Sequence, residues 1–429
     1  MAEGVWRLGV AGLGTVGSGL ISLIEADPRF APGGAKVEIA GVSARSRSRA
    51  RSFDIDAYEW FDDPVALATS AEVDVFVELI GGAEGPAKAA VEAALDAGKP
   101  VVTANKALIA HHGANLARLA ETRGVPLLYE AAVMGGTPAV KMLREALVGE
   151  EVETVAGILN GTCNFILSQM ELTGRDFAEV LAEAQRLGYA EADPSTDIGG
   201  FDAAHKITIL AALAFGAAPD LGGARVEGLA GVELLDLRLA RDLGFRIKLL
   251  ASAHRAADGI RVAVQPALLP LGHPLARADG ALNALFIEGS RIGRIFMEGP
   301  GAGAGPTAAA AAADVAEVIS GARRPVFRRP ASELVPMARG AAGRQLERAY
   351  LRLLVRDQTG VIAGISETLA EAGVSIDSFL QKHVESVEGV PIVLTTHPAR
   401  ETVLADAVAE LARLPALIDA PRMMRIARV

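Results

Sequence analysis

Residues 5–18, VWRLGVAGLGTVGS, set the class of fold. The apolar run Val5–Ala11 predicts a buried strand, and SGLISLIEAD after it has the apolar period of a helix. Between them stands a G-x-G-x-x-G fingerprint in the strand–turn–helix context of dinucleotide-binding folds. We expect it to bind the cofactor with Gly12, Leu13, Gly14, Thr15, Val16 and Gly17. A glycine-rich turn without a ligand is the alternative, but the complete βαβ context favours a cofactor.

Strand-like runs continue to residue 129. They are Val37–Val42, Val73–Ile80, Pro100–Thr103 and Val125–Tyr129, separated by helix-length segments such as Pro86–Ala97 and Leu108–Arg123. Strands that alternate with helices predict a doubly wound, Rossmann-type parallel sheet. Because such sheets bind ligands at the carboxyl ends of their strands, Thr103, Asn105 and Lys106 are expected to line the cofactor.

The second of these strands ends in an arginine-rich loop, with Ser43, Arg45, Arg47 and Arg49. An NAD-preferring site usually carries Asp or Glu at this point, whereas an arginine meets the extra phosphate of NADP. Arg45 is the first candidate because it is nearest the strand end. A solvated basic loop explains some of these arginines, so NAD stays possible.

Beyond residue 130 the pattern becomes mixed. Helices are predicted over Met142–Val148, 178–188 and 203–216, and strands over Glu153–Leu159, Ile260–Gln265 and Ala284–Glu288. These elements predict an α+β domain with a mixed sheet. After it, GPGAGAGP (299–306) is a candidate hinge with Gly303 near the cofactor. The alanine run that follows predicts a helix that packs back on the first domain.

An Arg/Pro-rich stretch precedes a compact C-terminal unit. The unit has strand Tyr350–Val355, helix Val361–Ala372, strands Ser375–Lys382 and Val390–Thr395, helix Glu401–Ala412 and strand Met423–Ile426. This βαββαβ order is ferredoxin-like. The predicted organisation is a cofactor domain over 1–135, with about 300–322 packing back on it. A second domain over 136–300, a linker over 323–347 and a C-terminal domain over 348–429 complete the chain.

Composition excludes several classes of function. The 429 residues carry 42 basic against 52 acidic side chains, a net charge of −10. This balance disfavours nucleic acid and anionic membrane surfaces as partners. One cysteine, Cys163, excludes an internal disulfide, and the seven histidines are not spaced as a metal cluster. With neither a signal peptide nor a membrane-length apolar run, the chain is predicted to be cytoplasmic.

Four segments together resemble one enzyme family. They are VVTANKALIA (101–110), YEAAVMGGTPAVKMLREAL (129–147), GILNGTCNFIL (157–167) and GYAEADPSTDIGGFDAAHK (188–206). They resemble homoserine dehydrogenase, which interconverts aspartate 4-semialdehyde and homoserine with NAD(P) in threonine, methionine and isoleucine biosynthesis. The match runs in order over almost the whole chain. DQTGV (357–361) is similar to the ACT domain of the monofunctional bacterial form. We therefore expect this form and not the version fused to an amino-acid kinase domain.

The resemblance assigns the catalytic residues. Hydride transfer to an aldehyde needs a proton for its oxygen, and a lysine with a lowered pKa is a plausible acid. Asp202 and Lys206, four residues apart, share one helical face, although such a pair is more often a surface salt bridge. The resemblance places both at the substrate and Lys106 beside nicotinamide and substrate. Which lysine delivers the proton stays open.

The substrate also has an amino group and a carboxylate. The stretch GYAEADPSTD supplies the acids Glu191 and Asp197, and without the family it would be an acidic surface loop. The resemblance implies that Glu191 contacts the amino group, that Asp197 supports it, and that Gly188 and Tyr189 shape the pocket.

The resemblance further implies a structural Na⁺, or another monovalent cation, at Glu130, Val133, Gly135 and Thr137. A hard cation suits carbonyl and carboxylate oxygens there. Without the family, GGTP would be only a turn.

It also implies a threonine-binding regulatory site. A turn that opens a helix presents backbone N–H groups to a carboxylate, and Asp357, Gly360, Val361 and Ala363 are the candidates. An ACT domain that only dimerises is the alternative. A homodimer or homotetramer is expected.

Two rival functions remain. A phosphorylating semialdehyde dehydrogenase forms a thioester and needs a thiolate with a basic partner, for which Cys163 is the sole candidate and has no adjacent histidine. A nucleotide-bound amino-acid sensor on the same folds would tolerate loss of Lys106 and Lys206.

Overall fold

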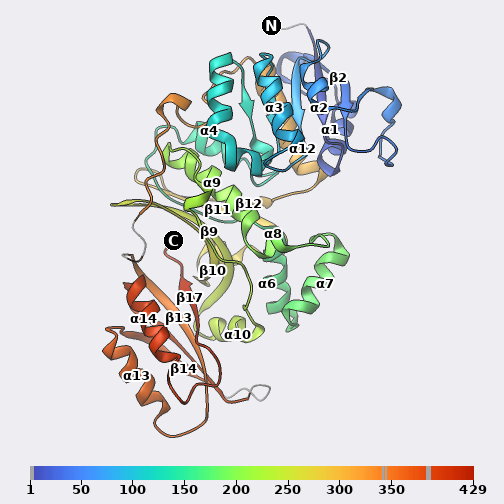
Figure 1. Cartoon of the computed structure of the whole chain (residues 1–429). Helices are drawn as coiled ribbons and strands as arrows, with labels where there is room; N and C mark the ends of the chain where they lie inside the picture. Colours follow the sequence, from blue (N-terminus) through green and yellow to red (C-terminus); the bar gives the residue numbers. More distant parts are fainter. Residues whose placement is uncertain (1–3, 341–342, 344, 383–387) are drawn as a thin grey trace.

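A computed structural model describes residues 4–340, 343, 345–382 and 388–429 (Figure 1). Its N-terminal part is a six-stranded sheet in the order β3-β2-β1-β4-β5-β6, and every pair in it is parallel. The strands are β1 (Val5–Ala11), β2 (Lys36–Ser43), β3 (Glu59–Phe61), β4 (Val75–Glu78), β5 (Val101–Thr103) and β6 (Leu127–Leu128). Helices α1 (Thr15–Ala26), α2 (Pro64–Thr69), α3 (Pro86–Asp96) and α4 (Lys106–Arg123) connect them. The predicted Rossmann-type sheet is confirmed.

The alanine run forms α12 (Ala304–Ile319), which packs along α1. The two helices approach closely because small residues face each other: a Cβ added at Gly19 would lie 2.7 Å from the carbonyl oxygen of Ala304. Ala308, Ala311 and Val315 share one buried cluster with residues of α1. A segment some 290 residues downstream of α1 thus closes the first core (Figure 1).

A second, long sheet of eleven strands holds the rest of the chain, in the main order β12-β11-β7-β9-β10-β17-β13-β15-β14. Its first part comprises β7 (Val152–Ile158), β9 (Phe245–Ala256), β10 (Gly259–Pro270), β11 (Leu282–Gly289) and β12 (Gly293–Pro300). Its helices are α6 (Gly161–Thr173), α7 (Phe177–Leu187), α8 (Ser195–Ile198), α9 (Phe201–Phe215), α10 (Leu234–Asp242) and α11 (Pro274–Arg277). The helix predicted over Met142–Val148 begins as α5 (Ala139–Lys141) and continues as a π-helical turn over Met142–Ala146.

The C-terminal unit has the predicted βαββαβ order. It comprises β13 (Leu346–Val355), α13 (Val361–Glu371), β14 (Ile376–Gln381), β15 (Val390–Thr396), α14 (Glu401–Leu411) and β17 (Arg422–Ile426), with a short β16 (Ala399–Arg400). Not foreseen was that β17 pairs in parallel with β10, joining Ala267 to Arg425 and Leu268 to Ile426. This pairing merges two sheets into one. It involves few residues far apart in the chain, so strand patterns alone do not reveal it.

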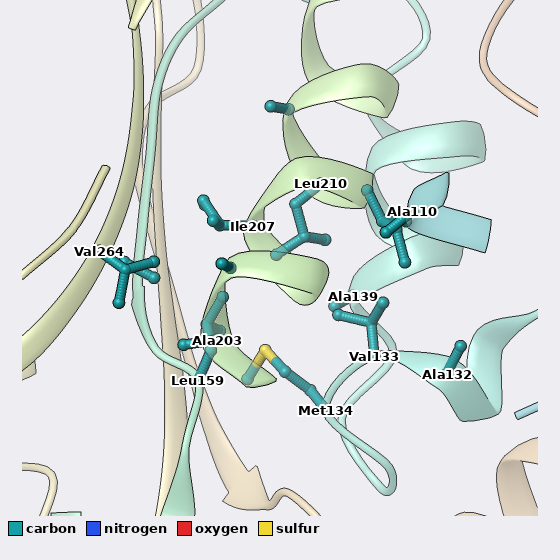
Figure 2. Packing of buried hydrophobic residues seen from close by; sticks show 14 of the residues in the cluster. Ala110, Ala132, Val133, Met134, Ala139, Leu159, Ala203, Ile207, Leu210 and Val264 are labelled. Carbon is teal, nitrogen blue, oxygen red and sulfur yellow. The ribbon is translucent and has the colours of Figure 1, made fainter. Parts of the chain in front are cut away.

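Helix α9 lies between the two sheets and is buried along nearly its whole length. Figure 2 shows the apolar contacts around it, with Leu210 facing Ala110 of α4 and Val264 of β10 lying near Ile207. Met134 and Val133 pack against its first turns. A helix held on all sides gives fixed positions to the polar side chains at its N-terminal end. Among the described residues, no helix is long and apolar enough to cross a bilayer.

Candidate active site

The fingerprint turn has the geometry expected of each glycine. Gly12 has φ +100°, and a Cβ there would lie 2.3 Å from the carbonyl of Leu79. A Cβ at Gly17 would lie 2.0 Å from the carbonyl oxygen of Gly12. Only glycine therefore allows the helix to pack this closely on the turn after the strand. A Cβ at Gly14 would meet nothing within 4 Å. Gly14 is the N-cap of α1, and the helix N-terminus is therefore open to a phosphate.

Three charged side chains meet where α4 and α9 begin. Nζ of Lys106 lies 3.1 Å from Oδ1 of Asp202, and Nζ of Lys206 lies 2.8 Å from Oδ2 of the same carboxylate. Lys206 also donates to the carbonyl of Leu159 at 2.7 Å. Asp202 and Lys206 are nearly buried, whereas the side chain of Lys106 is 38% exposed. One carboxylate therefore bridges two ammonium groups, one of which belongs to a partly exposed side chain.

Electrostatics fix the charge states of this cluster. Burial opposes ionisation of Asp202, but Lys206 and Lys106 hold its pKa well below the usual value. Asp202 in turn raises the pKa of Lys106 against the opposing effect of burial, with smaller contributions from Asp197 and Glu191. The expectation of a lowered lysine pKa is wrong for Lys106, because it considered burial and neighbouring cations without the carboxylate. Lys106 is a charged donor at neutral pH.

Asn160 and Thr162, which the sequence analysis did not single out, join the acids together. The Asn160 amide donates to Asp197 at 2.8 Å and to Asp202 at 2.9 Å, and the Thr162 hydroxyl lies 3.2 Å from Asp197. Burial and the neighbouring Asp202 raise the pKa of Asp197. Asn160 is the N-cap of α6, and its oxygen accepts the N–H of Cys163. In the sequence, Asn160 stands directly before the first residue of α6, which is a preferred position for a capping asparagine. This was the signal that could have identified it.

The other predicted substrate residues lie on the rim of this cluster. Gly188 ends α7 with φ +79°, and Tyr189 stacks on Phe165 while its carbonyl accepts the Thr162 hydroxyl at 2.6 Å. The Glu191 side chain is exposed, and its carbonyl accepts the side-chain amide of Gln185. The structure thus brings Asp197 next to Asp202 and leaves Glu191 at the solvent edge.

Cys163 is buried, and its thiol donates to the carbonyl of Asp197 at 3.2 Å. Burial raises its pKa well above the ordinary value. A buried thiol of this kind supplies no thiolate, which argues against thioester chemistry.

A hollow of about 340 Å³ adjoins the fingerprint. It is lined by Leu13, Gly14, Thr15, Ser18, Arg49, Ala50, Arg51 and Ser52. Arg45 is exposed and is not among these lining residues, and Arg47 pairs with Asp56. The Arg51 guanidinium donates to the carbonyls of Ser46, Arg47 and Arg49, so it holds the loop together. Arg49 is the arginine of this lining with the freer side chain.

The segment expected to hold a cation runs from Glu130 to Thr137. The Glu130 carboxylate accepts the backbone N–H groups of Val140 and Lys141 at 3.1 and 2.7 Å, so the start of α5 engages it. Gly135 has φ +45° and lies in a turn that is closed by the Thr137 N–H donating to the Met134 carbonyl at 2.9 Å, just after Val133. The Thr137 hydroxyl oxygen is buried and has no hydrogen-bond partner. Among the described residues, no three His, Cys, Asp or Glu side chains are grouped to hold a metal.

The DxxG turn of the C-terminal unit lines a second hollow, of about 310 Å³. Asp357, Gly360, Val361 and Ala363 all line it, together with Gln381 of β14. Gly360 is the N-cap of α13 with φ +87°. The structure therefore gathers all four predicted effector residues.

A doubly wound sheet with an open fingerprint, beside a buried Lys–Asp–Lys cluster, defines a nicotinamide-dependent oxidoreductase. Family models agree: residues 12–130 match the NAD-binding domain of homoserine dehydrogenase, 138–316 match homoserine dehydrogenase, and 349–416 match the ACT domain. The chain belongs to the homoserine dehydrogenase family. It catalyses the NAD(P)H-dependent reduction of L-aspartate 4-semialdehyde to L-homoserine.

Individual relatives match most or nearly all of the chain. A homoserine dehydrogenase of Pseudomonas aeruginosa is 41% identical, with 95% of each chain covered. The crystal structure of one from Thiobacillus denitrificans has a TM-score of 0.91 at 38% identity and 99% coverage of both chains. A hyperthermophilic archaeal homoserine dehydrogenase mutant in complex with NADPH has a TM-score of 0.65 at 27% identity, covering 75% of this chain and 99% of that one.

Proposed function

We propose that Lys106 and Lys206 act on the aldehyde oxygen and that Asp202 orients both. The observation that carries this assignment is the single carboxylate bridging the two ammonium groups at 3.1 and 2.8 Å. The nicotinamide supplies the hydride. The two ammonium groups polarise the aldehyde oxygen, and one of them releases a proton to it. Cofactor residues are the fingerprint, Thr103, Asn105, Lys106 and Gly303.

The substrate's amino group would bind at the acidic rim. Asp197 is already held by Asn160 and Thr162, so it supports this position, and Glu191 closes it from the solvent edge with Gly188 and Tyr189. The test follows NADPH absorbance with aspartate semialdehyde in wild type and Glu191→Gln. We expect a raised KM for the semialdehyde in the variant with kcat nearly kept. An unchanged KM contradicts the assignment.

We infer that the enzyme prefers NADP over NAD. In support, the loop after β2 carries arginines, and Arg49 lines the hollow beside Gly14 whereas the predicted Arg45 does not. Arg49→Ala is expected to raise KM for NADPH about tenfold and to leave KM for NADH unchanged, because only NADPH carries the extra phosphate. Arg45→Ala is the matched control, and an effect there instead would restore Arg45 as the phosphate ligand.

A structural Na⁺ at residues 130–137 is also proposed. Since α5 engages the Glu130 carboxylate, the carbonyls of Glu130, Val133, Gly135 and Thr137 would hold the ion. The unpartnered Thr137 hydroxyl supports the proposal. A melting temperature that rises with NaCl but not with choline chloride at equal ionic strength is the expected result. Equal melting in both salts contradicts it.

We propose threonine as a feedback effector bound at the DxxG hollow. Inhibition by threonine that is lost in Asp357→Ala, with basal turnover kept, is the expected outcome. Inhibition that persists in this variant would place the effector elsewhere.

Homodimerisation or tetramerisation is proposed through the long sheet. In support, a hollow of about 650 Å³ lies on the face opposite α9 and is lined by Leu250, Ser252 and Ala267 of β9 and β10. Light scattering after gel filtration tests the oligomeric state.

We further propose a cytoplasmic location, and domain limits at 1–135 with 300–322, 136–300, 323–347 and 348–429. Residues 1–3, 341, 342, 344 and 383–387 of these ranges lie outside the described structure.

A further inference from the structure

Glu78 is a fully buried carboxylate at the carboxyl end of β4. It stands in register with Ala11 of β1 on one side and Thr103 of β5 on the other. The strand order reverses between β1 and β4, and ligands of doubly wound sheets bind at this switch point. Glu78 therefore lies under the crevice in which the cofactor binds.

Three donors converge on this carboxylate. Oε1 accepts the backbone N–H groups of Ile80 at 2.7 Å and Gly81 at 3.0 Å, and Oε2 accepts the Thr103 hydroxyl at 2.5 Å. The two carboxylate oxygens accept all three donors, whereas an amide would offer only one oxygen. Hydrogen bonds to a charged acceptor are the stronger kind, so Glu78 firmly joins two strand ends.

The first strand end is a loop that has little else to fix it. Gly81 and Gly82 both have positive φ, and both are exposed. Consecutive exposed glycines have more conformational freedom than other residues. Glu78 fixes the start of this loop, and the Asn105 amide donates to the carbonyl of Gly82 at 2.7 Å to fix its end.

The second strand end leads to the catalytic lysine. The Thr103 oxygen accepts the N–H of Asn105 at 2.9 Å, and the Asn105 side chain caps α4 by accepting the N–H of Leu108 at 3.0 Å. Lys106 is the first residue of α4. A continuous series of hydrogen bonds thus runs from Glu78 to the helix end that carries Lys106.

We propose that Glu78 is a positioning residue for the reaction. Its carboxylate shapes the floor of the cofactor crevice through residues 80 and 81, and it aims Lys106 at Asp202 through Thr103 and Asn105. The inference rests on the role proposed for Lys106. Glu78 would contact neither the substrate nor the proton that is transferred. It would fix the positions of residues 80 and 81 and of the start of α4.

The test uses Glu78→Gln in the full-length protein. One amide oxygen cannot accept all three donors, so the Kd for NADPH, measured by fluorescence titration without substrate, should rise about tenfold. The kcat at saturating cofactor should fall by a similar factor, because the start of α4 loosens. Thr103→Val removes one donor and should show part of both effects, whereas Thr103→Ser should recover most of that loss.

Glu150→Gln is the matched control. Glu150 is likewise buried and accepts the backbone N–H groups of Glu151, Arg291 and Ile292, but it holds the turn between β11 and β12. Its variant should lower the melting temperature while Kd and kcat stay at wild-type values. The proposal is overturned if Glu78→Gln changes only the melting temperature, as Glu150→Gln does.

If Glu78→Gln fails to fold, the comparison of Thr103→Val with Thr103→Ser tests the proposal instead. Equal Kd and kcat in Thr103→Val and Thr103→Ser would then overturn the proposal. A wild-type protein that binds NADPH but does not reduce the semialdehyde would refute the enzymatic function and not this inference, because the Kd measurement needs no turnover.

Discussion

Two buried charge clusters in this molecule follow opposite designs. At the active site one carboxylate, Asp202, faces two ammonium groups, and one of these is partly exposed. Where the C-terminal unit meets α10, Asp236 has no exposed surface and its Oδ1 accepts the Arg352 guanidinium at 2.7 Å, with Glu233 a further 3.2 Å contact. In the first cluster two cations share one carboxylate and the side chain of one of them, Lys106, is partly exposed, whereas the second pairs one buried cation with one buried carboxylate and leaves Glu233 mostly exposed. A site that binds a ligand oxygen keeps a cation whose charge the protein does not fully compensate, whereas a structural ion pair compensates its buried charges within the protein.

Lys206→Ala tests the first design and should give the largest effect. Loss of one of the two cations should reduce kcat about 10²- to 10⁴-fold, the range of positioned acid–base groups. NADPH binding should be nearly unchanged, because Lys206 contacts Asp202 and the Leu159 carbonyl and neither belongs to the fingerprint. Steady-state kinetics and fluorescence titration measure the two quantities.

The control for that variant is Lys248→Met, which also removes a buried lysine. It should keep kcat within a small factor. A kcat near wild type in Lys206→Ala would contradict the catalytic assignment and favour the nucleotide-bound sensor.

Arg352→Met tests the second design. An Asp236 carboxylate left buried without its cation should cost about 3–5 kcal/mol of unfolding free energy. Arg352→Met combined with Asp236→Leu should recover most of that loss, because an apolar pair needs no compensation. Urea unfolding measures both variants, and kcat per folded enzyme should stay constant. A double variant as unstable as the single one would show that the cluster does more than neutralise itself.

The residues of the active-site cluster could be named from the sequence, whereas the contact between Asp236 and Arg352 could not. The fingerprint follows its strand directly, so a local pattern predicted it. The spacing of four put Asp202 and Lys206 on one helical face, but their place at the substrate came from the family resemblance. Asp236 and Arg352 lie more than a hundred residues apart, and their contact follows from the long sheet that β10 and β17 build together. Strand order of this kind depends on tertiary pairing, which residue periodicity does not encode.

Contacts between distant elements, which the sequence does not show, also explain what was wrong or missed within the active site. The sequence suggested a lysine acid with a lowered pKa, from partial burial and neighbouring cations. For Lys106 the pKa is raised instead, because the Asp202 carboxylate on another helix lies beside it. Glu78 went unnoticed because an acid at the end of an apolar strand is indistinguishable in sequence from a solvent-exposed one. Only the structure shows three donors turned toward it.

Lys248 sharpens the comparison, since it is a buried lysine whose carboxylate contact, with the mostly exposed Asp279, is longer. Its Nζ donates to Asn164 at 2.8 Å and to the Ala278 carbonyl at 2.6 Å, while Asp279 is 3.4 Å away. Burial lowers its pKa from 10.5 to about 8. The unfolded chain therefore binds more protons between about pH 8 and 10.5, and the unfolding free energy should rise by about 3 kcal/mol across that window.

Lys248→Met should abolish this rise, whatever its effect on stability at pH 7. The observable is the difference in slope of unfolding free energy against pH between the two proteins, in which every other titrating group cancels. Equal slopes would mean that Lys248 stays charged in the folded state through Asp279, as Lys106 does through Asp202. In that case, the presence of a bridging carboxylate would no longer distinguish the active-site lysines from a structural one.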